Sequence, residues 1–133
     1  MKTTVLDASA LLAMFFGEPG VELMRQLFHK ASETDRLVFI SAVNWAEVVY
    51  RLEHKRGFAA AQDVKQFART TSLEVVPVNR ELAEAAAALK VKHNLGLADA
   101  FAAALAIDKK AELVAADKEF AAVVKEIKIN WLR

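Results

Sequence analysis

Two aspartates in this sequence directly follow short runs that have the length of buried β-strands. Asp7 follows residues 3–6, and Asp117 follows residues 113–116. In open α/β sheets, ligands bind beyond the carboxyl ends of the strands, so both side chains stand where a functional site is expected. The hydroxyl of Ser9 lies two residues after the first aspartate. Helix capping is the structural alternative for Asp117.

Two more carboxylates interrupt apolar helical segments. Asp99 is the only residue between positions 97 and 107 that is not apolar, and alanines stand three, four and seven positions after it. Glu47 shares one face of its predicted helix with Asn44, three residues earlier. An isolated ionised carboxylate in such surroundings is costly unless a cation or hydrogen-bond donors compensate it. Helix capping is the alternative for Asp99, and simple surface exposure is the alternative for Glu47.

Together these carboxylates indicate metal chemistry. If they meet at one edge of a sheet they repel one another, and a hard divalent cation such as Mg²⁺ or Mn²⁺ is the natural counter-charge for an oxygen-only site. Such a cation can activate a water and stabilise an in-line displacement at phosphorus, which is the chemistry of phosphodiester hydrolysis. The residues predicted to bind the metal and carry the catalysis are Asp7, Glu47, Asp99 and Asp117.

The elements that must position these groups alternate along the chain. Apolar stretches of strand length alternate with stretches of helical period, which predicts an α/β fold with helices as crossovers between parallel strands. The predicted strands are residues 3–6, 37–40, 73–78, 112–116 and 128–132. The predicted helices are residues 8–16, 20–30, 42–55, 59–70, 80–93, 97–109 and 118–125.

Caps and breakers agree with these boundaries. Ser41 and Asn79 stand where helix N-caps belong, and Gly57 and Gly96 are expected just past helix ends. Pro77 predicts that its strand ends there or lies at an edge of the sheet.

Composition limits the class of protein. The 133 residues, 55% of them hydrophobic, suit one domain spanning residues 1–133. The absence of cysteine excludes disulfides, thiolate metal sites and cysteine nucleophiles. No segment approaches the roughly 18 uninterrupted apolar residues of a membrane span, and no secretory signal is present, so a cytoplasmic protein is expected.

Net charge does not select a partner. The chain has 18 basic and 17 acidic residues, a net charge of +1, so a nucleic acid would have to meet a local basic patch. Phosphate contacts supply affinity without sequence information. The candidates for such contacts, each of which is otherwise a solvated surface charge, are Arg51, Lys55, Arg56 and Lys118.

Four motifs, in order, resemble those of the PIN-domain ribonucleases, and most closely those of the VapC toxins of prokaryotic toxin–antitoxin pairs. The motifs are Val5-Leu6-Asp7-Ala8-Ser9-Ala10, Ser41-Ala42-Val43-Asn44-Trp45-Ala46-Glu47, Leu97-Ala98-Asp99-Ala100 and Ala115-Ala116-Asp117-Lys118-Glu119-Phe120. The resemblance covers nearly the whole chain. It implies a three-layer α/β/α PIN domain with a mainly parallel central sheet of four to five strands.

The resemblance also implies an activity and partners. The chain would be a metal-dependent endoribonuclease, the toxin of a type II toxin–antitoxin system, with the acidic quartet binding Mg²⁺ or Mn²⁺. Ser9 and Asn44 would be supports that orient water or carboxylates. A homodimer and a VapB-type antitoxin, whose helical tail enters a hydrophobic groove, are the implied partners.

Two alternatives stay open at this point. The last motif often carries threonine or serine where this chain has Ala115, and this departure is the one feature that favours a catalytically inactive PIN-like binding module. A Mg²⁺-dependent phosphatase of the haloacid-dehalogenase type also begins with an aspartate after its first strand. It needs a second aspartate two residues later, and Ser9 stands there instead.

Overall fold

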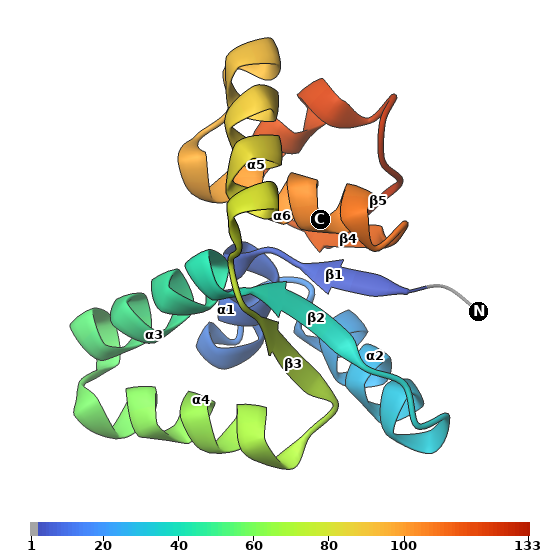
Figure 1. The fold of residues 1–133 in the computed structure, drawn as a ribbon. Helices are drawn as coiled ribbons and strands as arrows, with labels where there is room; N and C mark the ends of the chain where they lie inside the picture. Colours follow the sequence, from blue (N-terminus) through green and yellow to red (C-terminus); the bar gives the residue numbers. More distant parts are fainter. Residues whose placement is uncertain (1–2) are drawn as a thin grey trace.

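The computed structural model describes residues 3–133, and a sheet of five parallel strands lies at its centre (Figure 1). In chain order the strands are β1 (Thr4–Leu6), β2 (Val38–Ser41), β3 (Leu73–Val76), β4 (Glu112–Ala115) and β5 (Ile129–Trp131). Their spatial order is β3-β2-β1-β4-β5. The predicted α/β class is confirmed, and the sheet is parallel throughout its five strands.

This order creates a crevice at one place along the carboxyl edge. The chain winds outward from β1 to β2 and β3, and then from β4 to β5 on the other side of β1. Connections leave β1 and β4 toward opposite faces, so the carboxyl ends of these two strands flank the switch point at which α/β sheets bind ligands.

Helices cover both faces of the sheet (Figure 1). They are α1 (Ala8–Phe16), α2 (Val21–Glu33), α3 (Ala42–Arg56), α4 (Phe58–Thr70), α5 (Arg80–His93), α6 (Leu97–Asp108) and the 3₁₀ helix η1 (Lys118–Val123). The first four pack on one face, and α5, α6 and η1 pack on the other. None of the helices within residues 3–133 is both long and apolar enough to cross a membrane.

The central strand β1 is apolar at successive positions because helices cover both faces of the sheet. Successive side chains of a strand point to opposite faces, so Val5 packs into the core under α5 and α6 while Leu6 packs into the core under α1 to α4. Both are fully buried. A strand that is covered on both faces needs apolar residues at every position.

Most predicted boundaries agree with the structure to within a few residues. Ser41 and Asn79 cap α3 and α5 by accepting hydrogen bonds from backbone amides, as predicted. Gly57 ends α3 with φ of 93°. β3 is an edge strand and ends at Val76, directly before Pro77. Because proline has no backbone N–H, its position after the strand removes no hydrogen bond between strands.

Two local predictions were wrong. Residues 118–125 were expected to form an α-helix, but Lys118–Val123 forms a 3₁₀ helix, in which side chains three residues apart eclipse and so place Phe120 and Val123 together in the core. Gly96 does not end α5. Asn94 does so in the left-handed conformation with φ of 54°, and Gly96 is the N-cap residue of α6.

Candidate active site

Asp7 lies at the junction of β1 and α1, where its side chain caps the helix. Its carboxylate accepts hydrogen bonds from the Ala10 amide at 3.0 Å and from the Ser9 hydroxyl at 2.8 and 2.7 Å. The Ser9 Oγ in turn accepts a hydrogen bond from the Ala116 amide at 3.0 Å, which ties the end of β1 to the end of β4. Asp7 is 2% exposed, and burial raises its pKa to about 6 despite these hydrogen bonds.

Three other carboxylates gather beside this junction. One oxygen each of Asp99, Asp117 and Glu119 lies within 4.8 Å of the other two. Asp99 comes from the first turn of α6, and Asp117 is the N-cap of η1, accepting a hydrogen bond from the Glu119 amide at 2.9 Å. The Gly96 amide donates to Glu119 Oε1 at 3.3 Å, so the start of α6 and the start of η1 are held together.

The electrostatics of this group are unfavourable without a cation. Burial is the largest cause that raises the pKa of Asp99 to about 8. A hydrogen bond with the Asp117 carboxyl group and the negative charges of Asp117, Asp7 and Glu119 raise it further. Asp7 therefore belongs to the same electrostatic unit, because its charge acts on Asp99 and its own pKa is raised by Asp117.

Glu119 was missing from the predicted ligands. Its local sequence, between a lysine and a buried phenylalanine, resembles that of a solvated residue at the start of a helix. Its spacing of two residues from Asp117 is the signal that could have identified it. In the turn that opens η1 this spacing brings both side chains to Asp99.

Asn44 supports the site from α3. It is 1% exposed, and its Nδ2 donates to the Ala98 carbonyl at 3.0 Å, next to Asp99. The Ser41 hydroxyl donates to Asn44 Oδ1 at 2.5 Å, which orients the amide. These bonds join α3 to the first turn of α6, so Asn44 contacts the backbone that carries Asp99.

Glu47 lies apart from the three grouped carboxylates. Its Oε2 is 3.4 Å from Arg51 Nη1, one turn further along α3, and its side chain is 27% exposed. Its charge is not among the causes that raise the pKa values of Asp7 and Asp99. The structure thus groups two of the four predicted ligands, Asp99 and Asp117, and couples Asp7 to them electrostatically. The predicted role of Glu47 in metal binding stays a prediction.

The predicted RNA-binding residues have different surroundings. Arg51 and Lys55 line a cavity of about 270 Å³ together with Ser9 and Asp117. Arg56 instead packs over the Phe16 ring, with its guanidinium carbon 5.2 Å from the ring centre. Lys118 is exposed beside Asp117.

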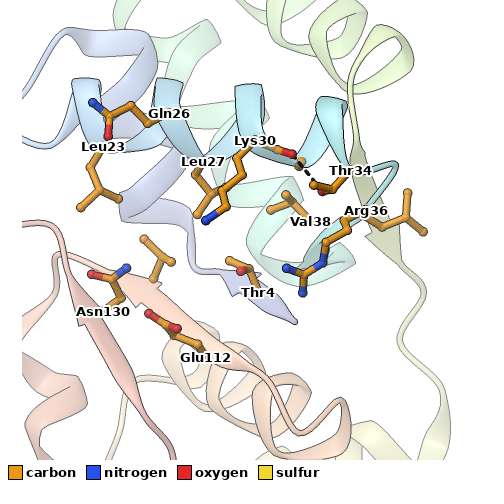
Figure 2. Close-up of a pocket in the computed structure, with 13 residues that line it drawn as sticks. Thr4, Leu23, Gln26, Leu27, Lys30, Thr34, Arg36, Val38, Glu112 and Asn130 are labelled. Atoms are coloured by element: carbon orange, nitrogen blue, oxygen red, sulfur yellow. Dashed lines mark hydrogen bonds between the residues drawn. The ribbon is translucent and has the colours of Figure 1, made fainter. Parts of the chain in front are cut away.

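A larger cavity, about 520 Å³, lies at the opposite edge of the sheet (Figure 2). In Figure 2 the helix α2 carries Leu23 and Leu27 over Thr4 and Glu112, which are the first residues of β1 and β4. None of the carboxylates described above lines it. The candidate active site is therefore at the carboxyl edge, although the larger hollow is at the amino edge.

The donor set at the carboxyl edge suits a hard divalent cation. Mg²⁺ and Mn²⁺ prefer oxygen ligands. The site offers only carboxylate oxygens, with no nitrogen or sulfur, from Asp7, Asp99, Asp117 and Glu119. The pKa of Asp99 is raised because a proton on its carboxyl group lowers the cost of gathering these negative charges. A divalent cation can lower the same cost.

Comparisons with known proteins agree with this geometry. The model of the PIN domain family matches residues 4–126. No curated protein matches the sequence. The chain is similar in structure to one in the DNA-bound VapBC complex from Salmonella typhimurium, with a TM-score of 0.79, 19% identity and coverage of 100% of both chains.

Two further solved structures share the fold. A chain of a toxin–antitoxin complex from Klebsiella pneumoniae matches with a TM-score of 0.76 and 19% identity, covering 98% of each chain. The VapC20 toxin of Mycobacterium tuberculosis, described as cleaving the sarcin–ricin loop, matches with a TM-score of 0.70 and 23% identity, covering 91% of this chain and 95% of that one. At these identities the likeness concerns the fold.

Proposed function

This chain belongs to the PIN-domain family, and from that membership we propose that it is a divalent-metal-dependent endoribonuclease that acts as the toxin of a toxin–antitoxin pair. The observation that carries the proposal is the group formed by Asp99, Asp117 and Glu119, whose oxygens lie within 4.8 Å of one another beside the buried Asp7. Such a group at the switch point of a parallel sheet is suited to a cation that acts on a phosphodiester.

The residues that would hold Mg²⁺ or Mn²⁺ are Asp99, Asp117, Glu119 and Asp7. A cation bound there supplies a water of lowered pKa and charge stabilisation for an in-line displacement at phosphorus. Asp7 contributes a fixed oxygen, since Ser9 and Ala10 hold its carboxylate. Asp99 and Asp117 would hold the cation as carboxylates, without the proton that the raised pKa of Asp99 favours.

The reaction needs no nucleophilic side chain. Water attacks the scissile phosphate, and the products carry a 5′-phosphate and a 3′-hydroxyl. A phospho-aspartyl phosphatase is disfavoured, because both oxygens of the buried Asp7 carboxylate accept hydrogen bonds and Ser9 cannot serve as its acid–base partner.

Partners follow from the same proposal. The structurally similar protein from Klebsiella pneumoniae is described as part of a toxin–antitoxin complex, and the one from Salmonella typhimurium as part of DNA-bound VapBC. We infer a VapB-type antitoxin, a homodimer, and action in the cytoplasm, where the RNA substrate is found. Light scattering of the purified chain, alone and with the antitoxin, tests the first two.

The decisive experiment uses protein shown by mass spectrometry to be free of antitoxin. It is incubated with total RNA and Mg²⁺ or Mn²⁺, with and without EDTA, and new 5′ ends are sequenced. Asp99→Asn should abolish cleavage, whereas Asp63→Asn, the same change at an exposed position of α4, should leave it intact. Unchanged RNA in the wild-type sample with metal would overturn the proposal and favour an inactive binding module.

A further inference from the structure

The cavity of about 270 Å³ beside the acidic group has a wall built from distant parts of the chain. Ser9 and Asp117, which belong to the acidic site or its support, form one side. Arg51 and Lys55 of α3 and the C-terminal residue Arg133 also line it. Its volume is close to the lower end of the range for small-ligand sites, so it suits a group of nucleotide size rather than a peptide helix.

The charges in this cavity are arranged to receive an anion. Three basic side chains line it against two carboxylates, Glu18 and Asp117. Asp117 is one of the groups that would be neutralised by the cation, which leaves Glu18 as the remaining acidic side chain of the lining. The basic side chains of the lining then outnumber the acidic ones.

The basic side chains are held in place with much of their donor capacity free. Lys55 Nζ lies 4.8 Å from the centre of the Phe16 ring, and no ion pair with Lys55 is found among residues 3–133. Arg133 donates one N–H to the Pro19 carbonyl at 3.4 Å, and a guanidinium has five such donors. Arg51 is held by Glu47 at 3.4 Å.

We propose that this cavity binds an RNA phosphate that neighbours the scissile one, so that Arg51, Lys55 and Arg133 position the strand over the metal site. The proposal rests on the ribonuclease function proposed above. It gives Glu47 a positioning role, through Arg51, that is independent of metal binding. Contacts of this kind act on the backbone and supply affinity without reading sequence.

The test measures KM and kcat for a single-stranded RNA that the wild-type chain cleaves, using Arg51→Ala, Lys55→Ala, Arg133→Ala and the triple variant. Each single variant should raise KM roughly threefold to tenfold with little change in kcat. The slope of log affinity against log salt should fall by about 0.7 for each lost contact, as for single strands. Arg69→Ala, which removes a positive charge from α4 outside the cavity, should match the wild type.

Chemically modified RNAs identify which phosphate the cavity binds. RNAs are made in which one flanking phosphate at a time is replaced by an uncharged methylphosphonate. One position should raise the KM of the wild type as much as the triple variant does, and it should add nothing in that variant, because both changes remove the same interaction.

The outcomes separate the two proposals. Absence of metal-dependent cleavage by the wild type would overturn the ribonuclease function itself. Cleavage by the wild type together with unchanged KM and salt slope in the triple variant would overturn only the phosphate site. If the triple variant instead lost antitoxin binding while cleaving RNA normally, the cavity would be a protein-binding site and the present proposal would be wrong.

Discussion

The two edges of the sheet are both hollowed, and they differ in the size of the hollow and in the carboxylates that lie beside it. The amino edge holds the larger cavity, with apolar side chains of α2 over the first residues of the strands (Figure 2). The carboxyl edge holds a smaller one beside carboxylates whose pKa values are raised. Because crowded carboxylates destabilise the folded chain, their presence points to function more directly than the volume of a cavity does.

The strongest test of this difference between the edges is to remove one charged side chain at each edge. Asp99→Asn should lower the rate of RNA cleavage on the order of a thousandfold, since a catalytic metal stabilises the transition state by several kcal/mol. Arg36→Ala in the amino-edge cavity should leave the rate unchanged. A comparable loss in both variants, measured as kcat/KM on one RNA, would contradict the assignment of function to the carboxyl edge.

The electrostatic cost of the carboxyl edge should appear as a dependence of stability on pH. Asp7 and Asp99 have pKa values of about 6 and about 8, above that of an unfolded aspartate, so the folded chain binds more protons than the unfolded chain in this range. The free energy of unfolding of the metal-free protein should therefore fall as pH rises from 5 to 8. Glu126, whose pKa is lowered by hydrogen bonds with Lys92 and His93, titrates below that window.

Thermal melts with EDTA measure this effect. Asp99→Asn should show a smaller fall in Tm than the wild type between pH 5 and pH 8, and Asp63→Asn should behave as the wild type does. At pH 7.5, Mn²⁺ at a hundredfold excess over its Kd should stabilise the wild type by about 2.7 kcal/mol, or about 10 °C. A wild-type Tm that rises with pH in EDTA would contradict the raised pKa values.

Glu119 and Glu47 should differ in how much each contributes to metal affinity. Glu119 lies with Asp99 and Asp117, whereas Glu47 pairs with Arg51. Glu119→Gln should weaken Mn²⁺ binding about tenfold or more by titration calorimetry, because losing even a group that only supports a metal ligand has an effect of about that size. Glu47→Gln should change it less, and Glu81→Gln on the exposed surface of α5 should not change it. A larger loss in Glu47→Gln would restore the sequence-based ligand set.

The smallest effect concerns one hydroxyl at each edge, that of Ser9, which joins β1 to β4, and that of Thr34, which bonds within the last turn of α2. Ser9→Ala removes the bonds to Asp7 and leaves the Ala116 amide without its partner, so it should cost about 1–2 kcal/mol of unfolding free energy. Thr34→Ala, whose exposed hydroxyl donates to the Lys30 carbonyl beside the amino-edge cavity, should cost under about 0.5 kcal/mol. Urea denaturation measures both, and equal costs would mean that the carboxyl edge is no more tightly joined.

Local patterns in the sequence were sufficient to predict the elements and several site positions. Apolar runs, helical periods and capping residues depend on neighbours within a few residues, so the five strands and the caps Ser41 and Asn79 could be predicted. Asp7, Asp99 and Asp117 could be singled out because a carboxylate in an apolar segment or at a strand end needs compensation.

Only the tertiary structure decided which of these groups meet. Strand order depends on contacts between residues far apart in sequence, and it places β4 beside β1, where Ser9 bonds to the Ala116 amide. The 3₁₀ turn, set by the packing of Phe120 into the core, turns Glu119 toward Asp99. The long side chain of Glu47 can reach several partners, and its pairing with Arg51 arises from three-dimensional surroundings that no local pattern encodes.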